Sequence, residues 1–178
     1  MKTKLILIRH GETVWNTERR VQGRKDSALT TNGIAQAEVL QEYLAAIAVD
    51  HCYSSPQHRA LQTARIALAK KAALIVHDQR LSEINLGDWE GKKITDLETD
   101  YPADYVQFAA GLPDVNFGGG ENLGEVQQRV MAALEEYARK HSGETVAVVS
   151  HGMAIAAALC ALNGVELNGR TYNRKTAA

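Results

Sequence analysis

The sequence is poor in cysteine. Only two, Cys52 and Cys160, occur among its 178 residues, and their spacing does not match that of a metal-ligand pair. Cys52 lies in a strand-like stretch and Cys160 in an apolar one, so we interpret both as small core residues. No spacing of His, Asp or Glu indicates another ligand set. We therefore expect neither a disulfide nor a metal site.

The sequence also lacks an excess of charge and a long apolar run. Its 20 basic and 21 acidic residues give a formal charge of −1, which excludes a large cationic field for nucleic acid or anionic lipid but allows a local basic pocket. The apolar stretch from Leu5 to Ile8 is too short for a secretory signal, and nowhere do about 18 apolar residues follow one another. We expect a soluble, cytoplasmic protein that binds neither nucleic acid nor membranes.

Strand-like and helix-like segments alternate along the chain. Its length and its 45% of hydrophobic residues suit one domain with a substantial core. Short apolar runs indicate strands at residues 5–8, 51–55, 73–77 and 145–150, and longer patterns indicate helices from about 31 to 47, 56 to 71, 123 to 137 and 152 to 163. This alternation predicts an α/β fold, a three-layer sandwich with a mostly parallel central sheet flanked by helices.

Local signals refine this outline. Thr30 or Thr31 is a candidate N-cap for the first long helix, and Ser55 followed by Pro56 is a candidate start for the second. The stretch from about 85 to 122 shows only short helical pieces and the turn cluster "FGGGEN". We interpret it as an excursion within a single domain of residues 1–178, and we expect it to cap a site.

Basic and imidazole side chains stand where the predicted strands end. Arg9 and His10 follow the first strand, His151 follows the last, and Arg59 lies on the first turns of the helix after the second. Because the carboxyl ends of parallel strands meet at one edge of a sheet, we expect these groups to converge with helix N-termini. Such a constellation fits a small-molecule phosphate better than other common ligands.

Phosphate binding alone would not need a histidine at the bottom of the pocket. A neutral imidazole can attack phosphorus, provided that its other nitrogen donates to a fixed acceptor such as a backbone carbonyl. The positive charges of Arg9 and Arg59 would lower the pKa of His10 and offset charge on the transferred group. Glu83 could protonate the leaving oxygen, although Asp88 and Glu90 lie nearby in sequence.

Four segments, "LIRHGET", "SSPQHRALQTA", "LSEINLGDWEG" and "VVSHG", resemble in order the motifs of the histidine phosphatase superfamily, in its phosphoglycerate-mutase-like branch. The resemblance spans residues 5–152 and is closest to broad-specificity and alpha-ribazole phosphatases. It implies that His10 is phosphorylated, that Glu83 is the proton donor, and that no metal ion or other cofactor is needed. The other residues that it assigns to phosphate or substrate binding are Arg9, Asn16, Gln22, Gly23, Arg59 and His151.

Three functions remain open at this point. A phosphatase would hydrolyse small phosphorylated metabolites, and a phosphoglycerate mutase would return the phosphoryl group to bound substrate. A regulatory module would bind phosphate without turnover, but the retention of both histidines and Glu83 speaks against it. Mutases tend to carry longer insertions around the site than this chain has room for, which favours the phosphatase.

The remaining histidine and aromatic residues can be explained without a catalytic role. His51, His58, His77 and His141 lack motif support and are interpreted as structural or exposed. Trp15, Trp89 and Phe108 either line the substrate side of the pocket or pack in the core. The chain stops at "GRTYNRKTAA" where related chains continue into another strand, so we expect an open sheet edge near residues 165–178 and self-association, for example as a homodimer.

Overall fold

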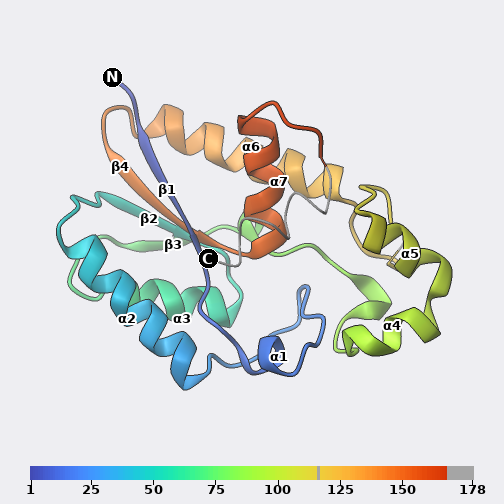
Figure 1. The fold of residues 1–178 in the computed structure, drawn as a ribbon. Coiled ribbons are helices and arrows are strands. Elements are labelled where there is room, and N and C mark those ends of the chain that lie inside the picture. Colours follow the sequence, from blue (N-terminus) through green and yellow to red (C-terminus); the bar gives the residue numbers. More distant parts are fainter. Residues whose placement is uncertain (116, 168–178) are drawn as a thin grey trace.

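The computed structural model describes residues 1–115 and 117–167 (Figure 1). Its strands are β1 (Lys4–Arg9), β2 (His51–Ser54), β3 (Ile75–His77) and β4 (Thr145–Ser150). Its α-helices are α1 (Val14–Thr17), α2 (Thr31–Ala45), α3 (His58–Ala67), α4 (Ile94–Asp100), α5 (Pro102–Ala110), α6 (Leu123–Lys140) and α7 (Gly152–Leu162). Two short 3-10 helices, η1 (Gln79–Leu81) and η2 (Gly87–Trp89), follow β3.

The four strands form one sheet in which every pairing is parallel. Their order is β1-β4-β2-β3, so the chain crosses over between neighbours. In the register of the pairs, Arg9 lies beside Ser150, and Val149 lies beside Ser54. The carboxyl ends of β1, β4 and β2 therefore meet at one edge, and the segments that follow them start from the same place.

Helices cover both faces of this sheet (Figure 1). Helices α2 and α3 pack on one face through small and aliphatic residues such as Leu44, Ala60 and Ala64, which contact Ile8 and Cys52 of the strands. Helices α6 and α7 bury a larger cluster on the other face. The predicted α/β three-layer sandwich is confirmed, and buried Cys52 and Cys160 are free thiols.

The helix starts follow local hydrogen bonding. Thr30 caps α2, because its side chain accepts a hydrogen bond from the backbone N–H of Gly33 at 3.0 Å. The prediction that Ser55 caps the next helix is wrong: α3 begins at His58, and its N-cap is Gln57. The Ser55 hydroxyl lies 2.7 Å from a ring nitrogen of His151 and also contacts Gln57, so it joins the ends of β2 and β4 to the residue before α3.

The excursion from residue 85 to 122 contains η2, α4 and α5, which lie to one side of the sheet (Figure 1). Trp89 is 1% exposed and packs edge-on against Phe108 and Phe117, with ring centroids 5.4 and 5.0 Å away. The structure therefore supports core packing, and not a position on the substrate side of the pocket, for Trp89 and Phe108.

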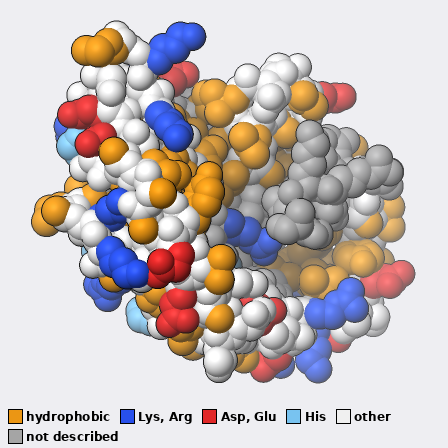
Figure 2. Space-filling view, turned by 60° about the vertical axis from the view of Figure 1, so that its left-hand side comes forward, with side chains coloured by type: hydrophobic (Ala, Val, Ile, Leu, Met, Phe, Trp, Pro, Cys, Tyr) orange, Lys and Arg blue, Asp and Glu red, His pale blue; other side chains and the backbone are white. Residues whose placement is uncertain are grey.

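The surface charge and the hydropathy of the helices agree with what the composition led us to expect. On the face shown in Figure 2, acidic and basic side chains are interspersed, and Lys or Arg side chains lie inside a hollow. Within the described residues, no helix is both long and apolar enough to cross a membrane. The expected open edge falls largely on residues 168–178, which lie outside the described residues, so self-association stays a prediction.

Candidate active site

Three of the predicted residues meet at the edge where the strands end. His10 follows β1, His151 follows β4, and their ring centroids are 5.1 Å apart. Arg59, on the first turn of α3, directs its Nε at His10 Nε2 across 3.3 Å. His10 is 8% exposed, His151 is fully buried and Arg59 is 1% exposed. The sheet thus gathers two imidazoles and a guanidinium in a protected position.

His10 is held in one orientation. Its Nδ1 lies 2.7 Å from the carbonyl oxygen of Gly11, the backbone acceptor that the sequence led us to expect. Burial and the guanidinium groups of Arg59 and Arg9 lower the pKa of His10 from 6.5 to about 3. A neutral ring that donates from Nδ1 to Gly11 keeps a lone pair on Nε2, which faces Arg59.

Arg59 owes its position to the loop after α1. Its guanidinium donates to the carbonyl oxygens of Lys25 and Gly23 at 2.7 and 2.8 Å, and it forms an ion pair with Asp26 at 3.1 Å. The Asp26 carboxylate also accepts hydrogen bonds from the backbone N–H groups of His58 and Arg59. A buried arginine with this many fixed acceptors is pre-oriented toward His10.

His151 lies deeper than His10. Its Nε2 is 2.7 Å from the hydroxyl of Ser55, whereas its Nδ1 is buried without a hydrogen-bond partner among the described residues. Burial, the Arg59 guanidinium and the His10 ring hold the pKa of His151 well below its usual value. His151 is therefore neutral near pH 7, and its Nδ1 is a buried polar atom that no described residue satisfies.

Glu83 reaches the same edge from the segment after η1. It is 9% exposed, and its carboxylate accepts hydrogen bonds from the backbone N–H groups of Met153 and Ala154, in the first turn of α7. Glu90, by contrast, accepts from the backbone N–H groups of Arg24 and Lys25 and so anchors a loop. Of the neighbouring carboxylates, Glu83 is the one tied to the helix that follows His151.

Arg9 and Asn16 are placed less tightly. Arg9 and His10 line the same small cavity, with Thr63 of α3. The Arg9 guanidinium is exposed and has no hydrogen-bond or ion-pair partner in the part of the chain that the structure describes. Asn16 closes a capping box on α1, where its Oδ1 accepts from the backbone N–H of Thr13 at 3.0 Å. The structure therefore does not bring Asn16 into hydrogen-bonding contact with His10.

Gln22 and Gly23 lie in the loop that orients Arg59. Gln22 is buried, and its Oε1 has no partner among the described residues. Gly23 has a φ of +53°, and a Cβ there would overlap the Glu90 carboxylate. Any other residue would be strained at this position, from which the carbonyl reaches both Arg59 and the side-chain amide of Gln57.

Sequence reasoning missed several residues that organise the site. Asp26 holds Arg59, and the Gln57 side chain joins Gly23 to the backbone N–H of Glu83 at 2.8 Å. Thr63 accepts a hydrogen bond from the backbone N–H of Gly11 at 3.0 Å. Gln57 lies inside the "SSPQHRA" segment and Asp26 lies in the loop between α1 and α2, but neither position carries a signal that reveals a partner far along the chain.

The sequence and the fold both match those of known proteins. A family model described as histidine phosphatase superfamily (branch 1) matches residues 5–177. Phosphoserine phosphatase 1 of Hydrogenobacter thermophilus is 41% identical over 166 residues, which cover 93% of this chain and 78% of that protein. Phosphoglycerate mutase-like protein 4 of Arabidopsis thaliana is 38% identical over 155 residues, or 85% of this chain and 67% of that protein.

A solved structure shares the fold. Bacillus stearothermophilus YhfR superimposes with a TM-score of 0.90 at 38% identity, over 93% of this chain and 82% of that one. The family resemblance drawn from the four motifs is thereby confirmed along nearly the entire chain. With the sheet edge, its two histidines and its buried arginine in place, this chain belongs to the histidine phosphatase superfamily and is an enzyme of its phosphoglycerate-mutase-like branch.

Proposed function

We propose that this enzyme is a phosphatase that hydrolyses small phosphomonoesters through a covalent phosphohistidine at His10. The observation that carries the proposal is the pair of hydrogen bonds that the His10 ring makes. The Nδ1 of His10 lies 2.7 Å from the Gly11 carbonyl oxygen, to which it donates. Because the pKa of the ring is low, Nε2 is unprotonated beside Arg59. A neutral nitrogen next to a guanidinium is arranged to attack a phosphoryl group whose oxygens that guanidinium holds.

In the first step, His10 Nε2 forms a bond to phosphorus, and the bond between phosphorus and the ester oxygen breaks with its electron pair going to that oxygen. Arg59 and Arg9 offset the charge on the equatorial oxygens, and His151 offers its free ring nitrogen to the same group. Glu83 supplies the proton to the leaving oxygen. Its attachment to the first turn of α7 supports this role, since it holds the carboxyl beside His151.

In the second step, water attacks the phosphohistidine. Glu83, now a carboxylate, takes the proton from that water while the bond between phosphorus and Nε2 breaks. Inorganic phosphate leaves, and His10 returns to its neutral state. Positive charge comes from arginine throughout, so we propose that neither step needs a metal ion.

The loop after α1 supplies contacts to the rest of the substrate. The buried Gln22 Oε1 has no partner among the described residues and is a candidate acceptor for a substrate donor group. Gly23 acts by holding Arg59 through its carbonyl. Asn16 would have to donate from its amide nitrogen, because its Oδ1 already accepts from the Thr13 N–H and hydroxyl.

We also propose that the excursion from 85 to 122 caps the site. Its two ends join beside Glu83: the backbone N–H of Asn85 donates to the Glu121 carboxylate at 2.9 Å, and the N–H of Glu121 donates to the Asn85 carbonyl at 2.8 Å. Arg129 ties Glu121 and the Glu83 carbonyl together. These contacts hold the two ends of the excursion together next to Glu83, the proposed general acid, and this position supports a role in capping the site.

A phosphoglycerate mutase is the second candidate, because a relative named as mutase-like is 38% identical. A panel of phosphomonoesters, assayed with and without 2,3-bisphosphoglycerate, separates the candidates. Phosphoserine heads the panel, since a relative at 41% identity is named a phosphoserine phosphatase, and 3-phosphoglycerate, α-ribazole 5′-phosphate and sugar phosphates follow. We expect phosphate release that does not depend on the bisphosphate. Isomerisation that requires it would establish the mutase, and phosphate binding without turnover would establish a regulatory module.

A further inference from the structure

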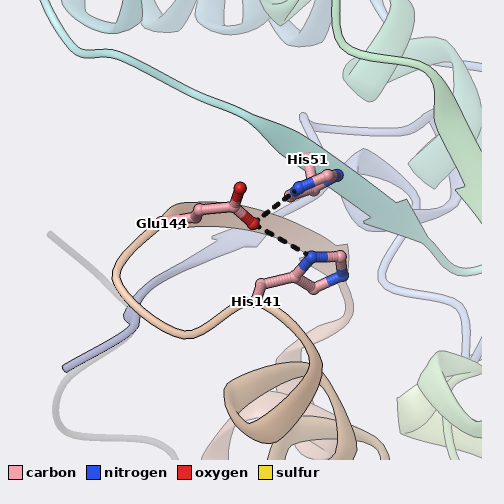
Figure 3. A group of neighbouring side chains, drawn as sticks. All are labelled: His51, His141 and Glu144. Carbon is pink, nitrogen blue, oxygen red and sulfur yellow. Dashed lines mark hydrogen bonds and ion pairs between the residues drawn. The ribbon is translucent and has the colours of Figure 1, made fainter. Parts of the chain in front are cut away.

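Three side chains with metal-binding chemistry meet at the other end of the sheet (Figure 3). His51 is the first residue of β2, His141 directly follows α6, and Glu144 precedes β4. This group could not be recognised in the sequence, because His51 and Glu144 are 93 residues apart in the chain. Parallel pairing of β2 with β4 brings the two strand starts, and so these side chains, together.

The donor atoms of the three side chains converge on one point. Glu144 Oε2 lies 2.9 Å from His51 Nε2 and 3.3 Å from His141 Nδ1. The two imidazole rings lie against each other, with centroids 3.8 Å apart and planes inclined by 30°. All three donor atoms lie within 4.8 Å of one another. Two ring nitrogens therefore face the space that a single carboxylate oxygen now fills.

The orientation of His141 is fixed by a further contact. Its Nε2 lies 2.9 Å from the hydroxyl of Tyr53, and the side chain is buried. Tyr53 is itself held by stacking on Tyr137, with ring centroids 3.8 Å apart. In metal sites, a ligating histidine commonly donates its second nitrogen to such a partner, which sets the tautomer and the ring plane. In the present structure Nδ1 lies 3.3 Å from the Glu144 carboxylate, which can only accept a hydrogen bond. With an ion bound, Nε2 would donate to Tyr53, and the lone pair on Nδ1 would face the ion.

We propose that His51, His141 and Glu144 bind a divalent transition-metal ion of the zinc, nickel or copper class. Imidazole nitrogens and one carboxylate form a donor set that such ions prefer, and water would fill the fourth position. An ion about 2.0–2.1 Å from each nitrogen takes the place of Oε2, so the carboxylate must withdraw. Glu144 can do this, because its side chain is 48% exposed and lies in a turn.

This site is separate from the phosphate chemistry. It lies at the start of β2 and β4, whereas His10 and His151 follow the ends of the strands. The six residues of β4 span about 17 Å between the two edges. The ion would join the start of β2 to the turn between α6 and β4, so its effect falls on the stability of the fold and not on phosphoryl transfer.

The test is a titration of the full chain with Zn²⁺, Ni²⁺ and Cu²⁺, followed by calorimetry and by thermal unfolding. We expect one high-affinity ion per chain, and an unfolding midpoint raised by about 5 to 10 °C at a hundredfold excess of ion over Kd. His51→Gln and Glu144→Gln should each weaken binding at least about 10-fold, and Tyr53→Phe by about 10- to 100-fold. His77→Gln, which removes an exposed histidine of β3, is the matched control and should bind like wild type.

Nitrogen chemical shifts of the histidine rings show which atoms bind. Zn²⁺ should shift His51 Nε2 and His141 Nδ1 and leave His77 unchanged. Absence of saturable binding by all three metals would overturn the proposal. So would unchanged binding by the His51→Gln, Glu144→Gln double variant, because the ion would then bind elsewhere, for example at His10 and His151.

Discussion

At the scale of single residues, burial of His10 links catalysis to folding. The ring must stay neutral to attack phosphorus, and its burial beside Arg59 lowers its pKa to about 3. An unfolded histidine binds a proton below about pH 6.5, whereas folded His10 does not until about pH 3. Between these values the unfolded state binds more protons, so stability is complete above pH 6.5 and is lost as the pH falls.

We predict that this difference is measurable by denaturant unfolding at pH 7, 6 and 5. For His10 the free energy of unfolding should fall by up to about 1.4 kcal/mol per pH unit below 6.5, and His151 adds to the slope in the same direction. His10→Gln should flatten the slope, whereas His77→Gln, at an exposed position, should not. Parallel curves for wild type and His10→Gln would show that the buried ring is not held neutral.

The role of Glu83 is tested by changing the leaving group. An alkyl phosphate leaves as a poor alkoxide and needs a proton, whereas p-nitrophenolate is a stable anion and needs little help. Glu83→Gln can still accept from the N–H groups of α7, so its fold should persist. In single-turnover phosphorylation of His10, we expect a loss of about 10²- to 10⁴-fold with the alkyl ester and a small loss with p-nitrophenyl phosphate.

Two neighbouring carboxylates serve as controls for that experiment. Asp88→Asn and Glu90→Gln should slow phosphorylation by both esters equally, if at all. Asp88 is exposed, and Glu90 anchors the loop after α1 through the backbone of Arg24. Equal losses for both esters in Glu83→Gln would reduce Glu83 to a residue that shapes the pocket. Dependence on the leaving group in Asp88→Asn or Glu90→Gln would move the proton-donor role to that carboxylate.

At the scale of elements, the loop that carries His10 packs unusually close to the start of α2. A Cβ on Gly11 would overlap the Gly33 carbonyl, and a Cβ on Gly33 would overlap the Glu12 carbonyl. Both contacts are with backbone, which cannot move aside as a flexible side chain would. Glycine at these two positions therefore lets β1, the His10 loop and α2 approach one another.

We predict that Gly33→Ala destabilises the fold by about 1–3 kcal/mol through overpacking and slows phosphorylation of His10 by displacing its loop. Gly124→Ala is the matched control, since it also lies in the first turn of a helix, and its Cβ would meet only the Asn122 side chain. That variant should be neutral or gain up to about 1 kcal/mol from helix propensity. Equal effects of the two substitutions in denaturant unfolding would refute the close-packing argument.

The start of α3 shows where element-level prediction fails. Ser-Pro is a common helix start, yet the Ser55 hydroxyl contacts His151, and the helix begins three residues later at His58. A local rule gives the preference of a side chain for a cap, but it contains no information on a competing partner far along the chain. The strand at 145–150 and the helix from Leu123 were predictable, because their periodicity depends on burial alone.

At the scale of the whole molecule, the sequence predicts features that follow from strand topology, but not those that depend on contacts between distant segments. Arg9, His10, Arg59 and His151 stand at or near strand ends, so parallel topology predicts that they share one edge of the sheet. Asp26 and Gln57 are ordinary loop residues whose roles depend on how the loop after α1 folds over α3. The His51, His141 and Glu144 group likewise emerges only when strand starts are paired.

The two edges of the sheet lead to a prediction for the intact enzyme. Exhaustive EDTA treatment should leave phosphate release unchanged, because arginine supplies the positive charge at His10 and the proposed metal site lies at the other edge. Vanadate should inhibit, since it mimics five-coordinate phosphorus. A steady-state assay before and after chelation decides the matter. Activity that disappears with EDTA and returns with Mg²⁺ or Zn²⁺ would place a metal in the phosphate chemistry.

The proposed mechanism depends on transfer of the phosphoryl group to His10, and trapping the phosphorylated enzyme detects this transfer. Enzyme mixed with a ³²P-labelled phosphomonoester is quenched in alkali within the first turnover, and the labelled peptide is identified. We expect an acid-labile, base-stable adduct on His10 in wild type. His10→Ala should lose the adduct, and its turnover should fall by several orders of magnitude. Normal turnover by His10→Ala, or label on another residue, would contradict the proposed mechanism.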